Sequence, residues 1–99
     1  MGGDESSEER PLLVFFAAPN SGRARRVEGF LAQVLQGRGN HRTFRILRVD
    51  AQERPDLVER FRVTRLPALA VVEAKRVKRR LEAPRGCEDI RSVLRPWLR

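Results

Sequence analysis

Apolar residues in this chain follow two kinds of spacing that alternate along its length. Residues 11–17, PLLVFFA, form a continuous apolar run of strand length, typical of a central strand covered on both faces. From Gly22 to Leu35 apolar residues recur three and four positions apart, which predicts an amphipathic helix that ends at Gly37. After the turn-rich GRGNHR segment, TFRILRV predicts a second strand over residues 43–49.

The second half of the chain continues this alternation. A proline at position 55 opens a short helix, because proline is tolerated in a first helical turn. The segments ALAVVE and RVKRRL predict an antiparallel hairpin with strands at 68–73 and 76–81. Helical spacing returns over residues 86–95, and Pro96 is expected to end that helix. Trp97 and Leu98 are then expected either to cap the core from outside the regular structure or to extend the same face past a kink.

The order of elements is therefore strand, helix, strand, helix, strand, strand, helix. Right-handed crossovers then give an α/β fold, a four-stranded mixed sheet with helices on both faces. Residues 11–99 are expected to form one domain, and residues 1–10 a disordered acidic tail. The predicted core consists of Leu13, Phe15, Val27, Leu31, Val34, Ile46, Val49, Phe61, Leu69, Val71, Leu81, Ile90 and Leu94.

Composition narrows the class of protein. The chain has 99 residues, no apolar run of membrane-spanning length and no secretory signal pattern in MGGDESSEER, so we expect a cytoplasmic protein without a membrane partner. Its one cysteine, Cys87, excludes an internal disulfide and any paired-cysteine redox or zinc motif. No metal and no cofactor is expected, and the sequence does not indicate an oligomeric state.

The formal net charge of +8 is unevenly distributed. The first ten residues sum to −3, which leaves +11 on residues 11–99. Such a domain favours anionic partners. All but two of the 21 basic residues are arginines, and they occur in almost every segment. The alternative interpretation is therefore that these charges only solvate the surface.

Residues 11–98 resemble a minimal thioredoxin fold in two segments. Where thioredoxins read Trp-Ala-Pro-Trp-Cys-Gly-Pro-Cys-Lys after a buried strand, this chain reads AAPNSGRAR from Ala17 to Arg25. The segment RVDAQERPDLVERFRVTRLPALAVV is closer still, with a Val-Asp pair, an acidic-Pro helix start and a proline before a strand. The resemblance implies that Pro67 is the cis-proline that faces the active-site loop.

The departures from thioredoxin concern its chemistry. The resemblance places Ser21 and Ala24 where thioredoxins have the nucleophilic and resolving cysteines, so no thiolate is present to exchange a disulfide. Phe15 stands at the place of a buried carboxylate, and Ala17 and Asn20 at the places of two tryptophans. The ten residues before the first strand are too few for the family's leading strand and helix. The resemblance thus implies a protein that is not an active oxidoreductase.

Two further residues have a structural and a chemical interpretation. Ser21 is most simply a helix N-cap, because a nucleophilic serine needs a nearby base and the only histidine, His41, follows the far end of the helix. Cys87 is most simply a small residue at a helix start. Its alternative is a regulatory or intermolecular thiol, since a helix N-terminus lowers the pKa of a thiol.

Arginines at one helix start are the most informative anomaly. Arg23, Arg25 and Arg26 crowd the end of the helix that already carries partial positive charge. Such local conflicts are expected preferentially at functional sites, and the resemblance places Arg65 at the same groove. The predicted groove, with an exposed Leu66, consists of Pro19, Asn20, Ser21, Gly22, Arg23, Arg26, Arg65, Leu66 and Pro67.

These observations lead to one preferred function and two alternatives. We expect a redox-inactive thioredoxin-like domain that binds a protein or an acidic peptide in this groove. The first alternative is weak, nonspecific binding of nucleic acid or another anion by the arginine-rich surface. The second is an oxidoreductase relative that has only lost its activity.

Overall fold

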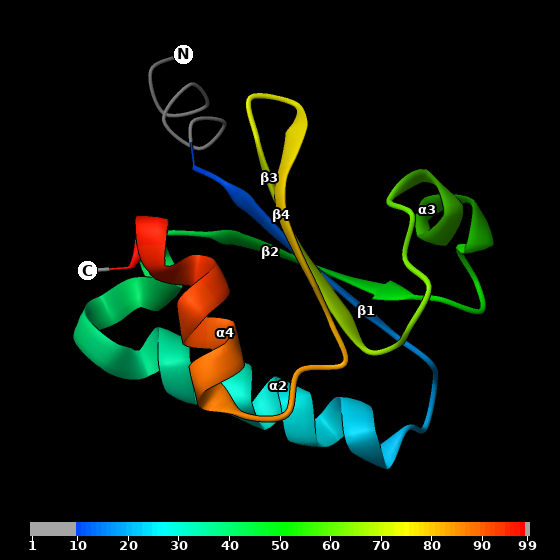
Figure 1. Cartoon of the computed structure of the whole chain (residues 1–99), viewed down its shortest axis with the longest axis horizontal. Coiled ribbons are helices and arrows are strands. Elements are labelled where there is room, and N and C mark those ends of the chain that lie inside the picture. The colour runs from blue at the N-terminus through cyan, green and yellow to red at the C-terminus, as the bar shows by residue number, and fades with distance from the viewer. Residues whose placement is uncertain (1–9, 99) are drawn as a thin grey trace.

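A computed structural model describes residues 10–98 and has the predicted order of elements (Figure 1). The strands are β1 (Leu12–Ala17), β2 (Arg45–Asp50), β3 (Ala68–Glu73) and β4 (Arg76–Glu82). The helices are α2 (Gly22–Gln36), α3 (Pro55–Arg60) and α4 (Cys87–Leu94), with 3-10 segments at Gly37–Arg42 and Arg95–Trp97. Residues 1–9 of the predicted tail lie outside the described residues.

The strands form one mixed sheet in the order β2-β1-β3-β4. β1 is parallel to β2 and antiparallel to β3, and β3 is antiparallel to β4. The hairpin between β3 and β4 turns at Ala74 and Lys75, which both have positive φ, of 54° and 64°. Figure 1 shows α2 and α4 on one side of the sheet and α3 on the other. The predicted four-stranded mixed sheet with helices on both faces is confirmed.

Each face of the sheet has its own apolar cluster. The larger cluster joins Leu13 and Phe15 of β1 to buried residues of α2 and α4, whereas Val14 and Phe16 belong to a smaller cluster under α3. Adjacent residues of a strand point to opposite faces, so β1 is buried from both sides as its continuous apolar run predicts. The prediction did not include Val14, Phe16, Phe44, Leu35, Ala24, Ala68 and Ala70, which are also buried.

The predicted core is wrong at three positions. Ile46 is 41% exposed, because β2 is an edge strand with a neighbour on one side only. Phe61 and Leu81 are half-buried and pack against the rims of the two clusters. The other ten predicted core residues are buried.

Two aromatic residues in contact with each other, Phe44 and Trp97, belong to the larger cluster. β2 begins at Arg45 instead of the predicted residue 43, so Phe44 precedes the strand and is buried. Its ring meets the edge of Trp97 with centroids 6.4 Å apart. Trp97 also donates from Nε1 to Glu73, over 3.3 Å, and the predicted packing of the C-terminal residues against the core is confirmed.

No helix within residues 10–98 is long and apolar enough to cross a membrane.

Candidate functional site

The loop after β1 leads directly into α2. Asn20 has φ of 59°, a left-handed conformation that asparagine adopts more readily than most residues. Ser21 is extended, and its hydroxyl accepts a hydrogen bond from the backbone N–H of Ala24 over 3.1 Å. The interpretation of Ser21 as an N-cap is confirmed. His41 belongs to the 3-10 segment that follows α2, so the structure brings no imidazole to this hydroxyl.

Arginines from three segments of the chain line one hollow beside the start of α2. The first turn of α2 has no acidic residue that could pair with these arginines. Arg23 and Arg26, one helical turn apart, line a hollow of about 330 Å³ together with Arg65. The other lining residues are Val27, Phe30, Ala83, Pro84 and Arg85. We call this hollow the arginine groove.

Arg65 is positioned by contacts on both sides of it. The backbone N–H of Thr64 donates to Glu82 Oε2 over 2.7 Å, and the Thr64 hydroxyl donates to Oε1 over 3.0 Å. The Thr64 N–H, with smaller contributions from the Thr64 hydroxyl and other neighbours, holds the pKa of Glu82 below its ordinary value. After Arg65, the Leu66–Pro67 peptide bond is cis. The Pro67 carbonyl accepts from the N–H of Ala83 over 2.8 Å, so this loop is fixed to the segment that follows β4.

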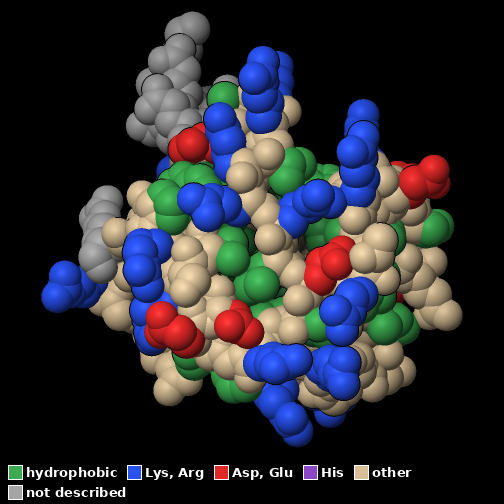
Figure 2. All heavy atoms as spheres, viewed as in Figure 1, with side chains coloured by type: hydrophobic (Ala, Val, Ile, Leu, Met, Phe, Trp, Pro, Cys, Tyr) green, Lys and Arg blue, Asp and Glu red, His purple; other side chains and the backbone are tan. Residues whose placement is uncertain are grey.

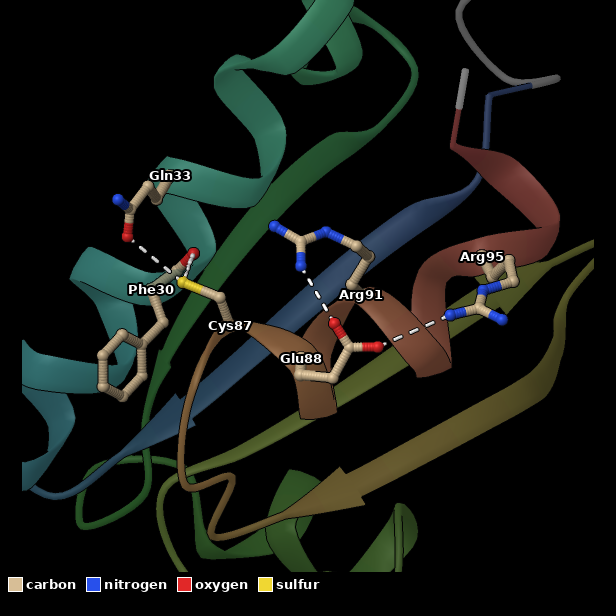
Figure 3. A network of polar contacts seen from close by, with 6 residues as sticks. All are labelled: Phe30, Gln33, Cys87, Glu88, Arg91 and Arg95. Atoms are coloured by element: carbon tan, nitrogen blue, oxygen red, sulfur yellow. Dashed lines mark hydrogen bonds and ion pairs between the residues drawn. The ribbon is translucent and has the colours of Figure 1, made fainter.

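Arg85 lies in the connection from β4 to α4, which is held at its far end. The backbone N–H of Arg85 donates to Asp89 Oδ2 over 2.9 Å. Figure 3 shows the Cys87 thiol against α2, where it donates to the Phe30 carbonyl over 3.7 Å and to Gln33 Oε1 over 3.1 Å. Cys87 is therefore half-buried in a contact between α4 and α2, next to one wall of the arginine groove.

The four arginines of the groove have no ion-pair partner among the described residues, a state that they share with most arginines of this part of the chain. Among the described residues, no carboxylate lies within ion-pair distance of Arg23, Arg26, Arg65 or Arg85. By contrast, Glu88 pairs with both Arg91 and Arg95, as Figure 3 shows, and Arg48 and Arg54 are paired with Glu28 and Asp56. In Figure 2, basic side chains gather over the N-terminal part of α2.

The composition of the groove determines what it can bind. Its floor contains the buried Val27 and Pro84 and the half-buried Phe30, and its exposed rim carries four guanidinium groups. Guanidinium groups bind carboxylates and phosphates through paired, charge-assisted hydrogen bonds. The arrangement therefore suits an anionic group that is attached to an apolar segment.

The structure brings together only some of the predicted groove residues. Pro19, Asn20 and Ser21 line a separate hollow with Arg25 and Asp50, and Gly22 lines neither hollow. Pro67 is buried and lines neither hollow. Leu66 was expected to be exposed, but it is half-buried against the cluster under α3, because the chain turns inward before β3.

Sequence analysis missed Arg85. Arg85 lies in the short connection between the predicted hairpin and the last helix, which is the signal that could have indicated it. It was not found because the helical spacing begins only after this residue. Within residues 10–98 no three residues of the His, Cys, Asp and Glu types gather where they could hold a metal ion.

Comparison with known proteins agrees with this architecture. The family model described as Thioredoxin matches residues 4–96. The structure of Trxlp from Edwardsiella tarda EIB202 superposes with a TM-score of 0.76 and 17% identity, over 99% of this chain and 91% of that chain. Fasciola hepatica thioredoxin superposes with a TM-score of 0.75 and 14% identity, over 97% of this chain and 88% of that chain.

A third similar structure is the germline-specific thioredoxin Deadhead from Drosophila melanogaster, with a TM-score of 0.69 and 15% identity over 92% of this chain and 82% of that one. A search of curated proteins found no match. At such identities the structural similarity shows the fold alone.

Proposed function

Because this chain belongs to the thioredoxin family but has Ser21 and Ala24 in place of the two family cysteines, we propose that it is a redox-inactive member that binds an acidic segment of a partner protein. The four unpaired arginines of the arginine groove are the observation that supports this most. The single cysteine, Cys87, suits a reducing compartment, and we propose a cytoplasmic location.

The chemistry of the loop supports the proposed redox inactivity. Disulfide exchange needs an accessible thiolate and a second thiol that resolves the mixed disulfide. The loop supplies a capping hydroxyl at Ser21 and a buried methyl group at Ala24, while Cys87 lies at the start of α4. We expect no turnover above background in an insulin-reduction assay and no change on replacing Cys87 with serine.

The bound segment is expected to carry carboxylates on both sides of an apolar residue. Its carboxylates would meet Arg65 and Arg85 on one side of the groove and Arg23 and Arg26 on the other. Its apolar residue would cover Phe30 at the floor. The free N–H groups of the first α2 turn strengthen the attraction for a negative charge.

Nucleic-acid binding fits the aromatic residues less well. Single-stranded nucleic acids stack their bases on exposed aromatic rings. Within residues 10–98, Phe15, Phe16 and Phe44 are buried and the remaining aromatic residues, Phe30, Phe61 and Trp97, are half-buried. Contact with phosphates alone would be blind to sequence and steeply dependent on salt.

The test is a peptide-binding titration with matched arginine variants. An acidic peptide selected from a library is titrated into the wild type, Arg65→Ala and Arg79→Ala, followed by fluorescence polarisation. Both arginines are exposed, but Arg79 lies on β4 outside the groove. We expect Arg65→Ala to weaken binding about tenfold, the loss of one charge-assisted pair, and Arg79→Ala to change it about twofold or less.

Equal weakening by the two variants would contradict the groove, since only the net charge would then matter. Tighter binding of a single-stranded oligonucleotide than of the peptide, persisting at about 0.3 M salt, would favour the nucleic-acid alternative.

A further inference from the structure

The two edge strands of the sheet expose different side chains. Charged residues and bulges are the usual means by which an edge strand avoids pairing with another chain. β4 has both, with Arg76, Lys78, Arg79 and Arg80 exposed and a shift of register opposite Val71 and Val72. β2 also carries an exposed arginine, Arg48, but it exposes two adjacent apolar residues, Ile46 at 41% and Leu47 at 44%, where β4 exposes Val77 alone. The β2 edge is thus left open on both faces of the sheet.

The backbone of β2 has hydrogen-bonding groups directed away from the sheet. The N–H of Arg45 donates to Pro11 and the N–H of Ala51 donates to Ala17, both over 2.9 Å. Because the backbone of a strand repeats every two residues, the N–H and C=O groups of the odd-numbered residues of β2 point toward β1. The N–H and C=O groups of Ile46 and Arg48 therefore point away from the sheet. Among residues 10–98 no strand lies on that side.

Apolar surface continues from this edge toward α2. A groove of about 270 Å³ runs between α2 and β2, and Ile46 lines it together with Phe15, Leu31 and Leu35. Arg48 stands at its rim, where it forms an ion pair with Glu28. A strand added beside β2 would therefore cover apolar groups and satisfy backbone groups together.

We propose that β2 pairs antiparallel with β2 of a second copy of this chain, with Leu47 opposite the partner's Leu47. A two-fold axis between antiparallel strands requires the central residue to face its own counterpart. Only Leu47 and Arg48 lie near enough to the middle of Arg45–Asp50 to keep the strand paired along its length. Centring on Arg48 would set two like charges directly opposite, which is unfavourable.

The register centred on Leu47 also satisfies the other side chains and the backbone. It sets Ile46 opposite the partner's Arg48, and both positions have outward N–H and C=O groups that can form the ladder. The charge of Arg48 is already balanced by Glu28 within each copy. On the α3 face it sets Arg45 opposite the partner's Val49, so no like charges stand directly opposite.

The chain's own N-terminal residues are a less suitable occupant. Residues 1–9 contain one apolar side chain, that of Met1, and four carboxylates. They do not supply the alternating apolar residues that would cover Ile46 and Leu47. A second copy supplies these residues from the same strand.

The experiment is sedimentation equilibrium of the whole chain over a range of concentrations, at about 0.15 M and about 0.5 M salt, because the net charge of +8 opposes association. The variants are L47K, L47E and the control V77K, since Val77 is 45% exposed on the opposite edge strand. We expect a wild-type dimer, dissociation constants raised about tenfold or more for L47K and for L47E, and no change for V77K. An equal mixture of L47K and L47E should dimerise again, because opposite charges then face each other.

A wild-type chain that stays monomeric up to about 1 mM overturns the proposal, and the edge would then suit a strand of another protein. Equal weakening by V77K also overturns it, because the effect would then come from charge alone. Failure of the L47K and L47E mixture to associate overturns the proposed register. None of these outcomes bears on the arginine groove, which is lined by residues of α2, by Arg65 and by the segment after β4, and by no residue of β2.

Discussion

Replacing Arg23 with glutamate should stabilise the free protein and weaken its binding of an acidic peptide. Arg23 is exposed in the first turn of α2, which contains no acidic residue and two other arginines, Arg25 and Arg26. The N–H groups of this turn, of which the Ser21 hydroxyl caps that of Ala24, leave partial positive charge at the helix end. The substitution removes an unfavourable cation and adds a favourable anion at the same place.

The size of the gain follows from the exposure of the site. Each charge near a helix terminus contributes about 0.3–1 kcal/mol at low ionic strength, and exposed positions lie in the lower part of that range. Exchanging Arg23 for glutamate should therefore add about 0.5–1 kcal/mol to the free energy of unfolding. For a domain of this size the midpoint of thermal unfolding should rise by roughly 2–8 °C.

The assay is thermal unfolding followed by circular dichroism, at low and at high salt, with R79E as the control. Arg79 is exposed on β4 and its replacement changes the net charge equally, but it lies outside any helix. The reasoning is refuted if the two variants unfold at the same temperature, or if the advantage of R23E persists when salt screens the helix end. Unchanged peptide affinity in R23E would show that Arg23 has no part in the groove.

Two further predictions concern the segments that border the groove. Since the pKa of Glu82 is lowered in the folded protein, its hydrogen bonds stabilise the protein above the ordinary pKa, and this contribution is lost as the pH falls through the folded value. E82Q should therefore reduce stability at pH 7 by about 1 kcal/mol or less and flatten its acid dependence, as measured by urea unfolding between about pH 3 and pH 7. S21A should lower the free energy of unfolding by about 1 kcal/mol through loss of the N-cap. S21D should retain most of the wild-type stability in the same assay, because aspartate also caps helices. Equal losses in both variants would exclude a capping role.

The spacing of apolar residues predicted the strands and helices correctly, because the spacing within one strand or helix depends only on the residues of that segment. The apolar run of β1 required burial on both faces, and the helical spacing of α2 correctly placed Val27, Leu31 and Val34 in the core. The same reasoning was wrong at Ile46, because its burial depends on whether β2 has a neighbour on its outer side. Strand order is a property of the whole sheet and is not encoded in the period of one strand.

The site could be predicted in part for the same reason. The crowding of Arg23 and Arg26 is visible in the sequence, since both belong to one helical turn. Arg85 joins them only because Ala83 bonds to the Pro67 carbonyl and thereby sets the β4–α4 connection beside the loop that carries Arg65. Leu66 could not be placed either, because its burial depends on how the chain enters β3.

The start of α2 and the edge of β2 would bind different kinds of partner. The start of α2 favours a negative charge, as helix N-termini do for the thiolates of redox proteins, but here the loop has no thiol and the surrounding arginines increase the positive field. No described carboxylate lies within ion-pair distance of Arg23, Arg26, Arg65 or Arg85, so an acidic segment of the proposed partner would not have to displace an internal ion pair. In the proposed dimer the β2 edges are joined while both arginine grooves, which contain no residue of β2, remain accessible. A partner with two acidic segments could then occupy both grooves, and its apparent affinity would exceed that for either groove alone.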